Sequence, residues 1–273
     1  MSASESAAPT AEIPLLIDRK GGVLKLTLNR PKVLNSLTHP MMDELMGALK
    51  KAEKDAEIRC VVLAAAGRAF CAGADLGDLK KKYEASEILS LGAELRDRFN
   101  PLALQIRSME KPVVCMINGT AAGAGASLAL ACDLKVCSEN AKFMLAFIQV
   151  GLAPDTGISH WVVRKMGLAL ALEHAWTARP ILAAQALEFG LVNRVVPAER
   201  LEAETGELVE KILKAPPRAV ALTKRLLNRA AANDLQAQME YEAQIQEILG
   251  KTRDHREGVA AFLEGRPPVF RGE

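Results

Sequence analysis

Between Met116 and Asp133 the sequence reads MINGTAAGAGASLALACD. The run before it, Pro112–Cys115, is short, apolar and rich in β-branched residues, which predicts a buried strand. Its later part, Leu128–Ala131, predicts a buried helix. All residues from Gly119 to Ala126 are Gly, Ala or Thr, so another object can lie against the backbone there. A helix that begins here would point free N–H groups and its positive dipole end at that object, which favours binding of developing negative charge.

Three alternative structures can be compared with this run. Close packing of a helix on a strand, without any ligand, remains open. A dinucleotide fingerprint fails because Leu128 stands where G-x-G-x-x-G needs its third glycine. A phosphate-binding P-loop fails because no G-K-S/T follows. The pattern that remains is a strand–turn–helix unit that offers backbone donors.

The composition excludes several classes of protein. The 273 residues fit one large domain, or one domain with an appendage, and 49% of them are hydrophobic, which is ample for a core. A net charge of +2 and 4% aromatic residues disfavour nucleic-acid binding. No apolar run reaches the length of a membrane span. We therefore expect neither a nucleic-acid partner nor a membrane partner.

The N-terminus and the cysteines bear on the cellular compartment. Residues 1–13 are mostly small, polar or acidic and lack the features of a signal peptide. We expect a disordered tail there and a cytoplasmic protein. An odd number of cysteines without close pairs disfavours a disulfide framework, and four histidines without ligand spacing disfavour a metal site. The cysteines are Cys60, Cys71, Cys115, Cys132 and Cys137.

The rest of the first two hundred residues alternates strand and helix patterns. Gly21-Gly22 interrupts residues 15–28 and predicts a hairpin. Cys60–Ala65 predicts a buried strand that runs into Gly67–Leu76, a second turn of small residues. Two such strand ends would each deliver a backbone N–H donor to one place. The alternation predicts βαβ units and a mainly parallel sheet.

After Pro197 the pattern changes to helices alone. Four helical segments follow: Glu199–Lys214, Pro217–Ala231, Leu235–Leu249 and His255–Leu263. Their apolar residues recur at helical spacing, and we expect these faces to pack on the first domain and on other subunits. The sequence therefore predicts a core over residues 14–197 and a helical region over residues 198–273.

Four motifs together resemble the crotonase superfamily, the enoyl-CoA hydratases, isomerases and their relatives. They are Asn29-Arg30-Pro31 with Leu34-Asn35, Ala69–Leu76, Ile117-Asn118-Gly119 with Asp133, and Glu257–Glu264. The resemblance implies an α/β fold, a spiral of ββα units with a C-terminal helical oligomerisation region. It also implies a homotrimer or a dimer of trimers, and an acyl-CoA thioester as substrate with no cofactor apart from that coenzyme A.

The resemblance assigns catalytic groups and also shows departures. The N–H groups of Ala72 and Ala124 would bind the thioester carbonyl and stabilise its enolate. Hydratases of the family carry two glutamates, whose positions are Ser127 and Phe147 here. Neither side chain is a base that could activate water unaided. Two-glutamate hydration is therefore not expected.

Asp155 matches the position where several isomerases of the family place an acid, and its segment most resembles the isomerase that acts on a ring-epoxide CoA thioester. Read in isolation, Asp155 is an ordinary N-cap before a helix. With the resemblance, we expect an enoyl-CoA isomerase in which Asp155 moves the proton. An atypical hydratase, a dehalogenase-like hydrolase and a non-catalytic acyl-CoA binder are the alternatives.

The resemblance also implies a set of CoA and substrate contacts. Phe147, with Phe143, would build an apolar acyl pocket, and Phe262 and Arg266 would contact CoA from a neighbouring subunit. The run Lys80-Lys81-Lys82 is either a solvated face or a contact to a phosphorylated tail. The expected contact residues are Lys32, Val33, Leu34, Ala72, Gly73, Ala74, Asp75, Leu76, Gly123, Phe147, Phe262 and Arg266.

Overall fold

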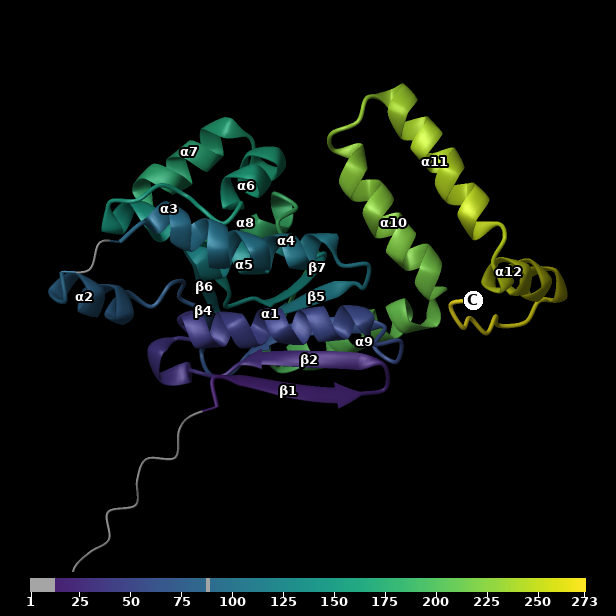
Figure 1. Cartoon of the computed structure of the whole chain (residues 1–273), viewed down its shortest axis with the longest axis horizontal. Helices are drawn as coiled ribbons and strands as arrows, with labels where there is room; N and C mark the ends of the chain where they lie inside the picture. Colours follow the sequence, from purple (N-terminus) through teal and green to yellow (C-terminus); the bar gives the residue numbers. More distant parts are fainter. Residues whose placement is uncertain (1–12, 87–88) are drawn as a thin grey trace, which may run out of the picture.

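The fold is built on two β-sheets, to which consecutive segments of the chain contribute strands (Figure 1). The structure is a computed structural model and describes residues 13–86 and 89–273. The expected N-terminal tail therefore lies, except for its last residue, outside the described residues.

The larger sheet has six strands in the order β1-β2-β3-β5-β7-β10. The first two form the predicted antiparallel hairpin across Gly21-Gly22, and each later strand pairs in parallel with its neighbour. The strands are β1 (Leu15–Lys20), β2 (Val23–Leu28), β3 (Cys60–Ala65), β5 (Val113–Ile117), β7 (Leu134–Ser138) and β10 (Arg194–Val196).

The smaller sheet has four short strands in the order β4-β6-β8-β9, parallel except for the last pair. Successive turns of the spiral supply one strand to each sheet, as β3 and β4, β5 and β6, and β7 and β8 do. The strands are β4 (Ala69–Cys71), β6 (Thr120–Ala122), β8 (Lys142–Met144) and β9 (Ile181–Leu182). The prediction of a mainly parallel α/β fold is confirmed.

Helices cover the sheets and then leave them. The helices of the first two hundred residues are α1 (His39–Lys54), α2 (Leu76–Glu84), α3 (Leu91–Glu94), α4 (Asn100–Ser108), α5 (Ala124–Ala131), α6 (Ile158–Met166), α7 (Leu168–Thr177) and α8 (Ala183–Glu188). Shorter helical turns are η1 (Pro31–Val33), the π-helical η2 (Leu95–Phe99), η3 (Ala146–Val150) and η4 (Ala198–Arg200). The C-terminal helices are α9 (Leu201–Lys214), α10 (Pro217–Ala230), α11 (Leu235–Leu249) and α12 (Arg253–Glu264).

The parallel strands bury side chains on both faces. On β3, Val61 and Leu63 join the main core, whereas Cys60, Val62 and Ala64 face a second cluster that includes α9 residues. This alternation follows from the two-residue period of a strand. The first of the four predicted C-terminal helices thus packs on the sheet, and the chain leaves the core only after Lys214. All five cysteines are buried and free, so the expectation of no disulfides is confirmed.

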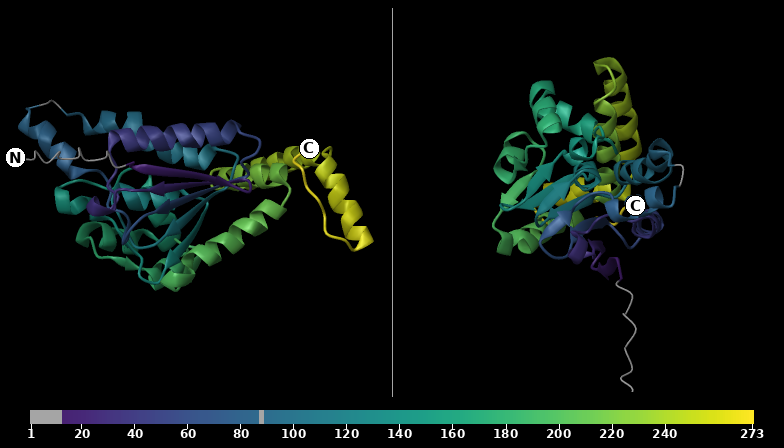
Figure 2. Two further views of the ribbon diagram at one scale, coloured as in Figure 1. Left: turned by 90° about the horizontal axis from the view of Figure 1, so that it is seen from below. Right: turned by 90° about the vertical axis from the view of Figure 1, so that its left-hand side faces the viewer.

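The three helices α10–α12 form an arm that projects beyond the sheet, as two perpendicular views agree (Figures 1 and 2). An ion cluster anchors the start of the arm. Lys224 of α10 places Nζ 2.7 Å from Asp133 Oδ2, and Arg107 lies 3.2 Å from Asp133 Oδ1. Lys224 also donates to two backbone carbonyls of the core. Since this lysine side chain is only 9% exposed, the cluster is a largely buried link between arm and core.

Candidate active site

Backbone packs directly on backbone where the two small-residue turns meet. A Cβ added to Gly119 would stand 2.1 Å from the carbonyl oxygen of Arg68, and one added to Gly125 would stand 2.3 Å from that of Cys71. Both glycines are therefore required by close approach, since real Cβ atoms do not come so near. The helix therefore packs closely on the strand, whereas the alternative of packing without any ligand stays a prediction. This close packing also brings the two turns into contact.

The first turn, Cys71–Leu76, does not offer the donor that the sequence predicted. The Ala72 N–H donates to the Leu34 carbonyl at 2.9 Å. The expectation that Ala72 supplies an oxyanion donor is therefore wrong for this structure. The group is already engaged, and a donor used inside the fold cannot bind a substrate oxygen at the same time.

The next donor along this turn is Ala74. Leu37 forms a parallel bridge with Ala74, in which Leu37 N–H donates to the Gly73 carbonyl and Asp75 N–H donates to the Leu37 carbonyl. A parallel bridge of this pattern uses the groups of the two flanking residues and turns those of the central residue to the other side. Among the described residues, no backbone acceptor takes the Ala74 N–H. Ala74 thus presents its N–H away from Leu37.

The loop beneath this turn is fixed by a buried amide and an ion pair. Asn35 adopts a φ of 56° and its side-chain amide donates to the carbonyls of Ala66 and Ala69, at 2.8 and 2.9 Å. Arg30 donates to Asp75 Oδ2 at 2.8 Å. The motif Asn29-Arg30-Pro31 with Leu34-Asn35 therefore shapes the first turn by structural bonds.

Asp75, expected to contact the substrate, is occupied by the fold. Its carboxylate caps α2 by accepting from Gly77 N–H at 3.0 Å and also accepts from Arg30 and Ser36. Partial burial alone would raise the pKa of Asp75, but the Arg30 and Ser36 hydrogen bonds and the Arg30 charge hold that pKa below its usual range. A side chain that makes these bonds is a poor candidate for a substrate contact.

The second turn offers donors from the start of α5. Gly123, with a φ of 50°, is the N-cap, and the first intrahelical bond runs from Ser127 N–H to the Gly123 carbonyl. The N–H of Ala124 is one of the first helical groups that have no partner inside their own helix. A Cβ on Gly73 would stand 3.3 Å from Ala124 N. The first turn and the start of α5 are therefore neighbours, and Ala74 and Ala124 are the candidate pair of donors.

Asp155 lies in the loop before α6, and it is not the N-cap of that helix. Helix α6 begins at Ile158 after Gly157, so Thr156 and Gly157 separate it from Asp155, and the side chain of Asp155 caps nothing. The N-cap interpretation of this residue is wrong. The half-buried carboxylate accepts from Thr156 Oγ1 at 2.8 Å. Burial raises the pKa of Asp155, and the Thr156 bond opposes that rise.

The two positions where hydratases of the family carry glutamates are filled differently here. Ser127 is fully buried, and its Oγ donates to the Asp155 carbonyl at 3.2 Å. It therefore links the loop of Asp155 to the first turn of α5. Phe147 is buried in η3, with its ring 3.9 Å from a Cβ built on Gly123. Phe143 lies on β8, and both phenylalanines belong to the main core.

Ala74, Ala124 and Asp155 line neither of two hollows on the described part of the chain. The larger, about 720 Å³, is bordered by charged side chains of α1, α2 and η2. The smaller, about 420 Å³, is apolar and lies between η3, α6 and α7. Ala153 and Pro154, which precede Asp155, line the smaller one, whereas Phe147 does not. The turns define the candidate site better than either hollow does.

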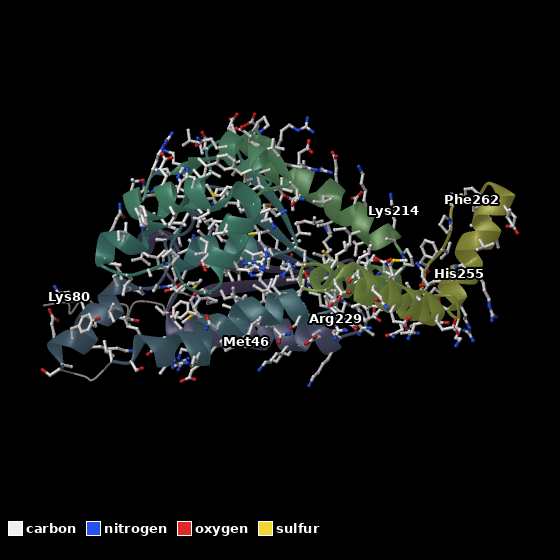
Figure 3. All side chains as sticks on the ribbon, turned by 90° about the horizontal axis from the view of Figure 1, so that it is seen from above. Met46, Lys80, Lys214, Arg229, His255 and Phe262 are labelled. Atoms are coloured by element: carbon white, nitrogen blue, oxygen red, sulfur yellow. The ribbon has the colours of Figure 1, made fainter. Side chains whose placement is uncertain are left out.

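The expected CoA contacts fall into two separate groups. Val33 and Leu76 are exposed near the first turn. Phe262 lies on α12, at the opposite end of the molecule from Lys80 (Figure 3), and Arg266 follows this helix by two residues. Arg266 is paired with Glu257 and Glu264. The structure therefore does not bring Phe262 and Arg266 to the candidate site of their own chain.

In the run Lys80-Lys81-Lys82, two lysines form a solvated face and one makes an ion pair with another helix. Lys80 and Lys81 are exposed and pair with acids of their own helix, at 3.6 and 3.7 Å. Lys82 is less exposed and donates to Glu94 at 3.1 Å. No phosphate contact is needed to explain these positions.

The roles of Thr156 and Ala74 in the candidate site become visible only in the three-dimensional structure. A β-branched residue at a left-handed position carries no mark in the sequence, although Gly157 beside it signals a turn. Ala74 was expected to bind substrate but not to supply the oxyanion donor.

Metal clusters and membrane spans are both absent from the described residues. No cluster of three or more His, Cys, Asp or Glu side chains in residues 13–86 and 89–273 could hold a metal ion. Within the same residues, no helix is both long and apolar enough to span a bilayer. The expected cytoplasmic location and the expected lack of a cofactor stay predictions.

Comparison with known proteins agrees with the fold and the motifs. The family model described as enoyl-CoA hydratase/isomerase matches residues 18–273. The chain is 40% identical to the 1,2-epoxyphenylacetyl-CoA isomerase of Escherichia coli over 92% of this chain and 96% of that one. It is 35% identical to the 2,3-dehydroadipyl-CoA hydratase of the same organism over 94% and 98%. The crystal structure of an enoyl-CoA hydratase from Mycobacterium smegmatis superposes with a TM-score of 0.88 at 36% identity, over 95% of this chain and 99% of that one.

Proposed function

Because this chain belongs to the enoyl-CoA hydratase/isomerase family, we propose that it is an isomerase, which shifts the double bond of an enoyl-CoA thioester through an enolate. The observation that carries the proposal is the position of Asp155. Ser127 Oγ donates to the backbone carbonyl of Asp155 and so ties the loop that carries this half-buried carboxylate to α5. The first N–H groups of α5 open beside Gly73, the neighbour of Ala74 in the first turn. A base and a pair of oxyanion donors thus belong to one unit of structure.

The reaction follows from these groups. Asp155 removes a proton from the α or γ carbon of the acyl group, and the electron pair moves onto the thioester oxygen. The N–H groups of Ala74 and Ala124 hold the resulting enolate. Asp155 then returns the proton to the other carbon and the carbonyl re-forms. One carboxylate serves both steps because the proton leaves and returns on one face.

Burial favours this role for the base. An ordinary carboxylate is too weak a base to accept a proton from carbon readily, and removal from water raises its pKa. Asp155 shows this direction of shift. The donors act by electrostatic preorganisation, and one oxyanion donor contributes about 3–4 kcal/mol to transition-state stabilisation in tested systems.

Hydration remains the second candidate, since relatives named as hydratases are similar over nearly the whole chain. Water activation would need a base at Ser127 or Phe147, and both positions lack one. We expect crotonyl-CoA to be hydrated far more slowly than a 3-enoyl-CoA is isomerised. Rapid hydration by the pure protein would favour the hydratase, and CoA-thioester binding without turnover of any 2-enoyl, 3-enoyl or ring-type thioester would favour a binding protein.

Asp155→Asn tests the base directly. The amide keeps the size of the side chain but cannot accept a proton, so turnover should fall by at least about a hundredfold while acyl-CoA affinity stays nearly unchanged. Double-bond migration is followed by the ultraviolet absorbance of the conjugated thioester. Asp18→Asn, on the exposed edge strand β1, is the matched control. Unchanged turnover in Asp155→Asn would remove this residue as the base.

Ala124→Pro tests the oxyanion donor. Proline at the first helical position is tolerated, because its missing N–H has no helical partner there anyway. The variant should fold and lose about 10²–10³-fold in kcat, the loss typical for one oxyanion donor. Leu235→Pro, at the exposed first position of α11, is the control for a proline at such a site. A folded Ala124→Pro protein with full activity would eliminate Ala124 from the mechanism.

We further propose that the chain assembles as a trimer or a dimer of trimers. Two separate surfaces expose large apolar side chains. The α7 surface comprises Ile148, Leu152, Val163, Leu168 and Trp176, and the arm surface comprises Leu235, Met239, Phe262 and Leu263. Two different surfaces that pair head to tail generate a closed ring when the rotation closes. Such pairing would also bring Phe262 and Arg266 of one chain toward another chain.

A further inference from the structure

Thr156 adopts a backbone conformation that its side chain disfavours. Its φ is 52°, in the left-handed region, and it is followed by Gly157 at 82°. Glycine adopts this region freely, whereas a β-branched residue there is a genuine outlier. Strained residues of this kind persist only where their surroundings hold them, and they cluster at functional sites. Thr156 is itself nearly buried, with 6% of its surface exposed.

Three hydrogen bonds around this strained turn end on Asp155. Thr156 Oγ1 donates to Asp155 Oδ1 at 2.8 Å. The backbone carbonyl of Asp155 accepts from Ile158 N–H at 3.1 Å and from Ser127 Oγ at 3.2 Å. Among the described residues, no hydrogen bond ends on Asp155 Oδ2. The main chain and one carboxylate oxygen are thus fixed, and the other oxygen is left available.

We propose that Thr156 is a positioning residue, whose hydroxyl holds Asp155 Oδ1 so that Oδ2 faces the reacting carbon and exchanges the proton. The proposal rests on the function given above. It explains why a threonine occupies a position that glycine would fill without strain. Only a side chain with a hydroxyl at this backbone position makes the 2.8 Å bond.

The same bond affects the charge of the base. Burial raises the pKa of Asp155, and the Thr156 hydrogen bond is the opposing influence because it stabilises the ionised form. No charged side chain of the described residues on α5, η3 or α6 contributes to this shift. His160 and Arg164, the nearest titratable groups along α6, pair with each other at 2.8 Å. Loss of the hydroxyl therefore raises the pKa of Asp155 further.

Three variants at position 156 separate the hydroxyl from the strain. Thr156→Val keeps the branched shape and loses the hydroxyl, so kcat should fall by about tenfold, the loss expected for one hydrogen bond to a charged group. The acid limb of kcat/KM should move to higher pH, because only the ionised form acts as base. Thr156→Ser should keep the rate and the pH profile near wild type. Thr156→Gly should lose activity like Thr156→Val and yet melt at an equal or higher temperature, because it relieves the strain.

The outcomes distinguish this proposal from the one it rests on. If Asp155→Asn is inactive while Thr156→Val and Thr156→Gly keep the wild-type rate and pH profile, Asp155 is the base and Thr156 does not position it. If Asp155→Asn stays active, the proposed base is wrong and with it the role of Thr156. A purely structural threonine would change the melting temperature without moving the acid limb.

Discussion

In the turns around Ala124, backbone lies against backbone, and one added carbon on Gly125 would stand 2.3 Å from a carbonyl oxygen. In the arm, by contrast, Phe262 is 85% exposed and Leu235 is 76% exposed. The turns are complete within one chain, because their donors, their base loop and their glycine contacts all come from residues 34–157. The arm instead leaves large apolar side chains uncovered. The contrast separates the part of the molecule that we propose performs chemistry from the part that we propose contacts a second copy.

The largest effect on stability should come from Gly125→Ala, which tests how closely the two turns pack. The new methyl group would meet backbone atoms that cannot move aside, so we expect a loss of about 3 kcal/mol or more, at or beyond the upper range for overpacking. Urea denaturation measures it. Gly206→Ala, on the exposed side of α9 with nothing within 4 Å of the added carbon, should instead stabilise by about 0.5–1 kcal/mol. Equal stability of the two variants would contradict the contrast.

The next effect concerns the joint between the two regions. Lys224→Met removes a largely buried charge and leaves Asp133 with the Arg107 ion pair and the Val113 N–H. The loss should cost about 3 kcal/mol, the lower range for breaking a buried pair. Lys251→Met, just after α11, removes a solvent-exposed pair with Glu247 and should change the free energy of unfolding by about 0.5 kcal/mol or less. Denaturation of both variants, with far-ultraviolet circular dichroism to follow the helices, compares them. An unaffected Lys224→Met protein would mean that packing alone holds the arm.

The third prediction tests whether the exposed apolar surfaces form contacts between subunits. Phe262→Glu and Trp176→Glu each place a charge on one of the two apolar surfaces, where those side chains are 85% and 67% exposed. Because neither supports the core of its own chain, the melting temperature at low concentration should change little. Light scattering should show the mass falling toward the 29.4 kDa of one chain. A wild-type protein that is already monomeric at micromolar concentration would overturn the proposed assembly.

The smallest effect is a gain of stability at the site itself. The folded pKa of Asp155 is raised above its unfolded value, so its ionisation opposes folding. The stability present below the unfolded pKa is lost as the pH rises through the folded pKa. Asp155→Asn should therefore melt slightly above wild type near neutral pH, and the difference should disappear in acid. A lower melting temperature at neutral pH would point to a structural role for the carboxylate.

Local patterns predicted the elements well, because each has a cause near in sequence. The Gly21-Gly22 hairpin, the strand Cys60–Ala65 and the four C-terminal helices all follow from turn chemistry and periodicity, and all are present. The motifs also led to the family and its fold.

The errors arose where a distant residue decides the outcome. Small side chains mark the first turn, but only the Leu34 carbonyl, from a different loop, determines that the Ala72 N–H is occupied. Aspartate is a common N-cap residue, so the sequence suggested that role for Asp155. The left-handed backbone of Thr156 and Gly157 instead places the start of α6 at Ile158. Phe262 and Arg266 cannot be assigned to a site from a single chain, because the described part of their own chain does not bring them to one.

The buried cysteines have one more consequence. Burial raises the pKa of Cys60, Cys71 and Cys137 to about 12, and only the thiolate reacts with alkylating reagents. Each sulfur can therefore be labelled only when the strand that carries it opens to solvent. Because these residues lie on β3, β4 and β7, the order in which reagent modifies them records which turn of the spiral unravels first. These three cysteines are therefore built-in probes of partial unfolding.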